Sequence, residues 1–123
     1  MITSKKKITM DSKYFKRSEF ACRCGCGFDT VDAELLDVLE DMRSQFERPV
    51  FINSGCRCQE YNASIGGAIN SQHMYARAAD IVVDGVSPYD VYKYFTNKYP
   101  GLYGIGSYYA FTHVDTRSYS ARW

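Results

Sequence analysis

The sequence lacks several features that define common protein classes. Its 15 basic and 14 acidic residues leave a formal charge of only +1, so it has no basic excess of the kind that nucleic-acid partners require. No apolar run approaches the roughly 20 residues of a membrane-spanning helix, so we expect no stable membrane insertion. Charged residues at positions 11–17 follow the Lys-rich start, and no apolar signal-peptide core develops. We therefore expect synthesis in the bacterial cytoplasm without a signal peptide.

The length and composition are those of one small globular domain. The chain has 123 residues, of which 46% are hydrophobic and 24% are charged, and a single core can stabilise a domain of this size. Residues 1–13 are polar and rich in lysine, and we expect them to form a flexible N-terminal arm. Residues 14–123 then form the domain.

Hydrophobic periodicity and turn residues predict a mixture of helices and strands. Leucines, Met42 and Phe46 recur at helical spacing after Asp32, a suitable N-cap, and Ser87-Pro88 is typical of a helix start. The expected helices cover residues 31–46, 59–65 and 87–99. The expected strands cover residues 50–52 and 78–83, and a hairpin of two further strands covers residues 102–115. A polar loop is expected over residues 68–77. The order shows no regular βαβ alternation, so we predict an α+β domain with a largely antiparallel sheet flanked by helices.

Histidine is scarce, and this limits the candidate metal ligands. The only histidines are His73 and His113, and Asp80 follows His73 by seven residues. Catalytic zinc takes three ligands from His, Asp and Glu and keeps one position open for water, which these residues would satisfy. The spacing alone favours the alternative, two surface or hydrogen-bonded histidines.

Cysteine occurs in two tight groups. The five cysteines are Cys22, Cys24, Cys26, Cys56 and Cys58. Their odd number argues against a fully paired secreted framework, and their spacing differs from the Cys-x-x-Cys of zinc ribbons. Three states stay open: a second, structural metal site; a buried thiol cluster, the commoner outcome in a cytoplasmic product; or a disulfide from the first group to Cys56 or Cys58 after release to an oxidising space.

Four sequence blocks, in the same order and spacing, resemble the zinc D-Ala-D-Ala carboxypeptidase family. They are residues 54–62 (SGCRCQEYN), residues 70–81 (NSQHMYARAADI), residues 111–117 (FTHVDTR) with the final ARW, and the opening residues 15–28 (FKRSEFACRCGCGF). The opening block is similar to that of short phage and prophage members. The resemblance covers about residues 14–123 and implies a hedgehog/DD-peptidase-like fold.

The resemblance also implies roles for individual residues. It implies that His73, Asp80 and His113 bind Zn²⁺, and that Arg57 holds a substrate carboxylate or a developing oxyanion. A rigid guanidinium fork can pair with a carboxylate at two points, although a structural or solvated arginine is the alternative. Ser71 and Gln72, beside the first histidine, are expected on the substrate side, where Ser71 can orient a ligand or pack the loop.

Two positions depart from the family pattern. Ala76 stands where the family has glycine, so we expect a gentler turn there. Ala110 stands three residues before His113, where well-known relatives place an acidic residue. The nearest acid is Asp115, and residues two apart on a strand share a face, so we predict Asp115 as the general base. The alternative is a structural carboxylate that bridges to Arg117.

The resemblance implies a zinc-dependent peptidoglycan peptidase that hydrolyses a D-amino-acid-containing bond, as a D-Ala-D-Ala carboxypeptidase or cross-link endopeptidase. Two alternatives stay open: an L-alanyl-D-glutamate endopeptidase (an endolysin), and a catalytically inactive, zinc-bound wall-binding or virion module. The expected partner is a peptidoglycan stem peptide. We further expect a monomeric phage or prophage lysis protein that acts at the cell wall or periplasm after release, with a holin for export.

Overall fold

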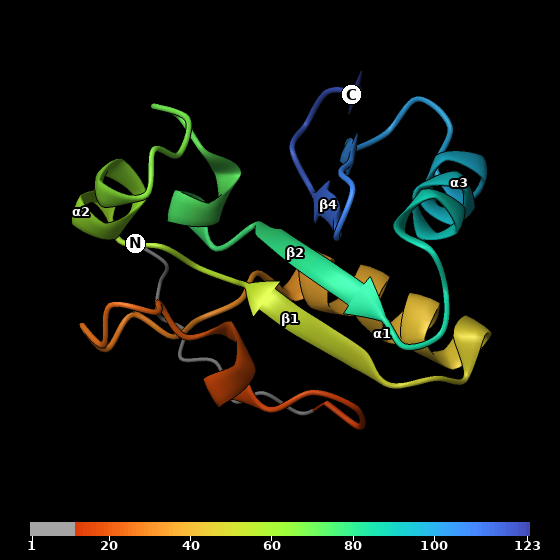
Figure 1. The fold of residues 1–123 in the computed structure, drawn as a ribbon, viewed down its shortest axis with the longest axis horizontal. Coiled ribbons are helices and arrows are strands. Elements are labelled where there is room, and N and C mark those ends of the chain that lie inside the picture. Colours follow the sequence, from red (N-terminus) through yellow and green to blue (C-terminus); the bar gives the residue numbers. More distant parts are fainter. Residues whose placement is uncertain (1–11) are drawn as a thin grey trace.

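The structure is a computed structural model that describes residues 12–123 (Figure 1). The predicted arm, residues 1–13, lies outside the described residues except for Ser12 and Lys13. Ser12 is tied to the domain, because its hydroxyl donates a hydrogen bond to Glu40.

The predicted helices and strands are found, with small shifts at their ends. The helices are α1 (Ala33–Phe46), α2 (Gln59–Ser64) and α3 (Pro88–Lys98), with the 3-10 helices η1 (Arg17–Phe20) and η2 (Gln72–Tyr75). The strands are β1 (Val50–Ser54), β2 (Ala78–Val83), β3 (Gly104–Ser107), β4 (Thr112–Asp115) and β5 (Ala121–Arg122). Within the described chain, η2 interrupts the predicted polar loop and β5 is an additional strand.

The strands form one sheet in the order β1-β2-β4-β3-β5. All neighbouring pairs are antiparallel except β3 and β5, which run parallel. Figure 1 shows α1 behind β1 and β2, with α2 and α3 at opposite ends of these strands. The predicted α+β class with a largely antiparallel sheet is therefore confirmed. No helix of residues 12–123 is both long enough and apolar enough to cross a membrane.

The core lies between α1 and one face of the sheet. Leu35, Leu39 and Met42 are fully buried at helical spacing along α1. The core residues of the sheet alternate along their strands, as the two-residue period of a strand requires; they include Ala79, Ile81, Ile105 and Val114. The residues between them, among them Asp80 and His113, therefore point to the opposite face.

Sheet register brings the chemically active residues of that opposite face together. Asp80 on β2 pairs with His113 on β4, and Ala78 pairs with Asp115. A β-bulge in β1, between Ile52 and Ser54, places Ser54 opposite Asp80. Bulges are frequent next to active sites because they redirect a side chain or end the pairing.

Two glycines of β3 leave space over the same face. Gly106 pairs with His113 and Gly104 with Asp115. A Cβ atom on Gly106 would lie 2.6 Å from the Trp123 ring, and one on Gly104 would lie 2.5 Å from both Arg117 Nε and Asp115 Oδ2. Trp123 and Arg117 thus fill the volume that β3 side chains would otherwise occupy.

The amino-terminal segment is packed directly against the chain that follows β1. The backbone N–H of Cys56 donates to the Phe20 carbonyl at 3.0 Å. A Cβ atom at Gly55 would lie 2.6 Å from both Cα and the carbonyl oxygen of Phe20. Only glycine allows these two backbones to approach so closely.

We expect Gly55→Ala to lower the free energy of unfolding by about 1–3 kcal/mol, the usual cost of forcing extra volume into a packed site. Equilibrium denaturation in urea measures this value. An unchanged midpoint would contradict the close packing of Gly55 on Phe20.

Candidate metal centre

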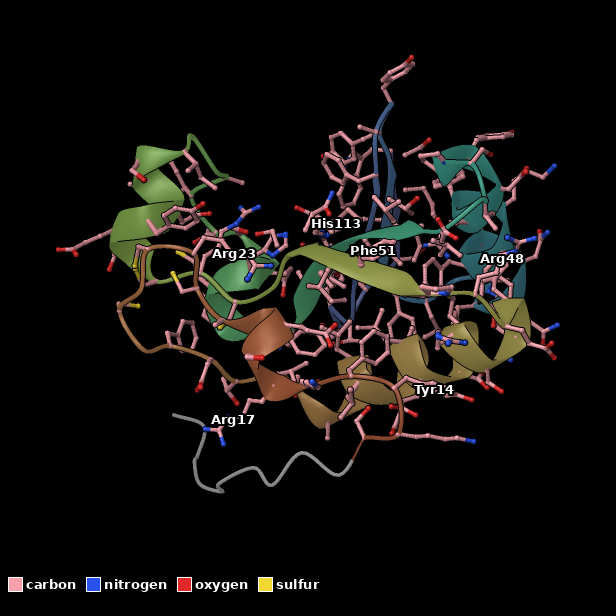
Figure 2. All side chains as sticks on the ribbon, turned by 60° about the horizontal axis from the view of Figure 1, so that its bottom comes forward. Tyr14, Arg17, Arg23, Arg48, Phe51 and His113 are labelled. Carbon is pink, nitrogen blue, oxygen red and sulfur yellow. The ribbon has the colours of Figure 1, made fainter. Side chains whose placement is uncertain are left out.

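The three predicted ligands meet on the sheet face opposite α1. His73 comes from η2, Asp80 from β2 and His113 from β4, and all three are buried. One ligand atom from each lies within 4.8 Å of the others. Figure 2 shows His113 near the middle of the molecule, beside β1 and β2.

One hydrogen bond fixes the His73 backbone, and another fixes its ring. The Ser71 hydroxyl caps η2 by accepting a hydrogen bond from the His73 N–H at 3.2 Å. The His73 Nδ1 atom lies 2.7 Å from the Gly55 carbonyl oxygen. A carbonyl can only accept, so Nδ1 donates to it, and Nε2 is the nitrogen that faces Asp80, whose Oδ1 lies 3.3 Å away.

His113 is oriented by a carboxylate. Its Nε2 atom lies 2.7 Å from Asp115 Oδ2, and its Nδ1 atom lies 2.9 Å from Asp80 Oδ1. Nε2 donates to Asp115, and Nδ1 is the nitrogen that faces Asp80. A carboxylate behind a ligating histidine fixes its tautomer and raises its basicity.

These donor atoms fit a zinc ion. Bonds of about 2.0–2.2 Å in a tetrahedron place neighbouring donor atoms about 3.4 Å apart, close to the 2.9 and 3.3 Å that separate Asp80 Oδ1 from the two histidine nitrogens. Two imidazoles and one carboxylate also leave a fourth position for water or substrate. His73, Asp80 and His113 therefore form a site suited to catalytic zinc.

The charges of the site are strongly coupled. Burial alone would raise the pKa of Asp80, but hydrogen bonds from His113 and His73 hold this pKa well below its usual range. Burial alone would lower the pKa of His113, yet the contacts with Asp115 and Asp80 raise it. Asp80 is thus ionised and ready to ligate, and at His113 a metal ion competes with a proton for Nδ1.

Asp115 is fully buried behind His113 rather than beside the ligand atoms. Its Oδ1 accepts from the N–H and Nε of Arg117, at 3.1 and 2.8 Å, and its Oδ2 accepts from Arg117 Nη2 at 2.7 Å. Burial alone would raise the pKa of Asp115, but these bonds and the one from His113 lower it. The His113 ring separates Asp115 from Asp80, so the geometry favours the bridging alternative over the predicted general base.

Arg57 lies next to the ligands with part of its fork still available. Its Nε donates to Ser54 Oγ at 3.1 Å, its Nη1 to Asn62 Oδ1 at 3.1 Å, and its Nη2 to Asp80 Oδ2 at 3.2 Å. A guanidinium has five N–H groups. Within the described chain, these contacts leave one N–H on each terminal nitrogen for a ligand.

A cavity of about 560 Å³ opens over the three ligands. Ser71 and Gln72, the residues expected on the substrate side, line it, and so do Arg57 and Arg117. Gln72 Oε1 is buried without a hydrogen-bond partner in residues 12–123. One side of the cavity is aromatic, and we call Tyr108, Phe111 and Trp123 its aromatic wall. The Trp123 ring lies 5.2 Å from that of His113. In the sequence, only the resemblance of the final residues, ARW, to the family pattern pointed to Trp123.

The expectation of a gentler turn at Ala76 was wrong. Ala76 ends η2 in the left-handed conformation, with φ 59° and ψ 27°. The neighbouring contacts hold it there, because its N–H donates to the His73 carbonyl at 3.2 Å and its carbonyl accepts from the Asp32 N–H at 2.8 Å. The conformation that favours glycine is kept, at a cost of about 1–2 kcal/mol.

The five cysteines are all free thiols. Cys22, Cys24, Cys26 and Cys58 lie together, whereas Cys56 is outside this cluster and buried. The structure brings the first group together with Cys58 but not with Cys56, its exposed Cys24 and Cys26 differ from a buried thiol cluster, and none of the five is in a disulfide.

Comparisons with known proteins agree with this geometry. A family model described as Peptidase M15 matches residues 13–115. Over 35 residues the chain is 46% identical to the zinc D-Ala-D-Ala carboxypeptidase of Streptomyces albus G. That match covers 28% of this chain and 14% of the relative, so the similarity concerns only a small part of the relative's length.

We expect Asp115→Asn to weaken zinc binding about 10–100-fold, because the amide cannot serve His113 as the carboxylate does. Loss of the charge beside Arg117 should also lower the free energy of unfolding by about 1–3 kcal/mol. A competitive zinc titration and urea denaturation measure the two effects, with Asp84→Asn, in the exposed turn after β2, as the control. Normal zinc affinity and stability with a 10²–10⁴-fold slower hydrolysis would instead identify Asp115 as the general base.

Proposed function

The chain belongs to the peptidase M15 family, and from this premise we propose that it is a zinc peptidase that hydrolyses a D-amino-acid-containing peptide bond of peptidoglycan. The bond is of the D-Ala-D-Ala carboxypeptidase or cross-link endopeptidase type. The convergence of His73, Asp80 and His113 at the floor of a cavity is the observation that carries this proposal. The name of the Streptomyces relative supports both the metal and the class of bond.

Zinc supplies the activation that these side chains lack. When bound, it would polarise the scissile carbonyl and lower the pKa of a water molecule to about 7. His73, Asp80 and His113 would hold it, and their own partners, Gly55, Arg57 and Asp115, keep each donor atom facing the site. The chain thereby preorganises the centre before substrate arrives.

Arg57 and Gln72 orient the substrate in this proposal. The two remaining N–H groups of Arg57 point from adjacent nitrogens of one rigid plane, which suits a terminal carboxylate or a carbonyl oxygen that gains charge. Gln72, which lines the cavity beside His73, would contact the stem peptide. The aromatic wall of Tyr108, Phe111 and Trp123 covers the apolar part of the ligand.

One observation favours a second candidate, the inactive zinc-bound wall-binding or virion module. Of the described residues that line the cavity, Asp80 is the sole carboxylate, and it is a proposed zinc ligand. Asp115 is separated from the cavity by His113. Such a site would bind stem peptides through zinc and Arg57 without a nearby group to accept a proton.

Peptidoglycan is the partner in either case. The L-alanyl-D-glutamate endopeptidase alternative concerns the same stem peptide. The remaining sequence-based expectations, a monomer that a holin releases to the cell wall, stay predictions.

Digestion of purified peptidoglycan by the zinc-loaded protein tests the function. We expect released peptides whose masses identify cleavage beside a D-amino acid, and no release by His73→Ala, which should also contain one zinc equivalent less per chain. Release of fragments cut between L-alanine and D-glutamate would support the endolysin alternative. Zinc-loaded protein that binds the wall but releases nothing would support the binding module.

We expect Arg57→Lys to slow peptidoglycan hydrolysis by about 10–100-fold, since lysine keeps the charge but loses the two-point fork. Arg48→Lys is the matched control, because Arg48 precedes β1 whereas Arg57 follows it, and Figure 2 shows Arg48 away from His113. Zinc content and melting temperature should stay near those of the unmodified protein. Equal rates for the two variants would remove Arg57 from the substrate site.

A further inference from the structure

Four cysteine sulfurs gather at the junction between the amino-terminal segment and α2. Cys22, Cys24 and Cys26 lie in the loop after η1, and Cys58 is the N-cap of α2. Their Sγ atoms all lie within 4.8 Å of one another. Figure 2 shows yellow sulfur atoms where this loop meets α2. The cluster is therefore compact although its members are up to 36 residues apart in sequence.

The sulfur spacing is that of a metal site. Zn–S bonds of about 2.3 Å in a tetrahedron place sulfur atoms about 3.8 Å apart. The Cys24 Sγ lies 3.5 Å from the Cys22 Sγ and 3.6 Å from the Cys58 Sγ. A disulfide bond, by contrast, measures about 2.05 Å. The Cys24 sulfur thus has two sulfur neighbours at the distance expected between ligands of one zinc ion. A disulfide would join it to only one of them.

Local backbone conformation directs the three loop sulfurs to one point. Gly25 and Gly27 have φ 81° and 97°, values that L side chains rarely adopt. The Gly25 N–H donates to the Cys22 carbonyl at 3.2 Å, and the Cys22 N–H donates to the Phe28 carbonyl at 2.7 Å. The loop is thus closed on itself, with alternate residues facing inward.

Backbone donors face the sulfur atoms, as thiolates require. The Cys58 N–H points at Cys22 Sγ at 3.4 Å, and the Tyr61 N–H points at Cys58 Sγ at 3.3 Å. Hydrogen bonds to an ionised acceptor are stronger than those to a neutral one. Four thiolates without a cation would repel one another, so the cluster is best satisfied by a bound divalent ion.

The fifth cysteine has a different environment. Cys56 is 2% exposed, and its thiol points at the Phe20 and Phe28 carbonyl oxygens at 3.2 and 3.1 Å. It therefore acts as a buried hydrogen-bond donor, and it provides an internal control for the other four.

We propose that Cys22, Cys24, Cys26 and Cys58 bind a second zinc ion, with a structural role. A closed set of four thiolates leaves no position for water or substrate, which distinguishes structural from catalytic zinc. The soft sulfur ligands and their tetrahedral spacing select zinc over magnesium or calcium. This inference is independent of the peptidase activity.

Such an ion would stabilise residues 55–58, the segment that contacts His73 and carries Arg57. Cys58 is adjacent to Arg57, whose N–H donates to the His73 carbonyl at 3.0 Å, and Gly55 accepts from the His73 ring. The ion would tie this segment, residues 55–58, to the amino-terminal loop. Binding free energy at a structural zinc site is folding free energy, so the ion would stabilise the segment that carries Arg57.

Zinc analysis of the His73→Ala variant isolates the proposed site, because the catalytic centre is then disabled. We expect about two zinc equivalents per chain in the unmodified protein and about one in His73→Ala. X-ray absorption of that variant should show sulfur neighbours alone, at about 2.3 Å. Loss of wall digestion in any preparation would bear on the peptidase proposal without affecting this spectrum.

The double variant Cys24→Ser/Cys26→Ser gives the complementary test, and both residues are exposed, so serine should not disturb packing. It should lose the sulfur-bound ion, keep the nitrogen- and oxygen-bound one, and melt at a lower temperature. Cys56→Ser should keep two ions.

Three results would overturn the proposal. The first is that His73→Ala protein purified with zinc and reductant contains no metal. The second is that intact mass after alkylation shows a disulfide among the four cysteines. The third is that the site contains iron in place of zinc.

Discussion

The buried carboxylate of Asp80 is the group around which the rest of the site is organised. Its oxygens contact His73, His113 and Arg57 at 3.3, 2.9 and 3.2 Å. An ionised carboxylate is costly to bury without partners. Asp80 therefore depends on these three side chains staying within contact distance. Each is held by a group of its own, namely the Gly55 carbonyl, Asp115, and Ser54 with Asn62.

Sheet register supplies one half of that support. The pairing of Asp80 with His113 places carboxylate and imidazole on one face, and the two-residue period of β4 places Asp115 directly behind. The glycines of β3 leave room above for Arg117 and Trp123. His113 is thus held between Asp80 and the ion pair of Asp115 with Arg117.

The chain after β1 supplies the other half. Residues 54–58 contact His73 through backbone groups, approach Phe20 closely at Gly55, and end in a cysteine of the proposed structural zinc site. The amino-terminal segment, which contributes no metal ligand to the catalytic site, therefore stabilises the position of Arg57. The sheet register and the chain after β1 both fix the surroundings of Asp80. A substitution that disturbs either should therefore displace the donor atoms of His73, Asp80 and His113.

The sequence alone determined the elements and the kinds of ligand. The helix at Ala33–Phe46 and the strand at Ala78–Val83 follow from local periodicity, and with two histidines in the chain there was little choice of donors. Tertiary structure alone decided which nitrogen of each histidine faces Asp80 and that Asp115 lies behind His113. It also decided that Ala76 keeps a left-handed turn and that Cys56 lies outside the cluster of the other four cysteines. These features depend on register and on contacts between distant segments, and local sequence patterns carry no information about either.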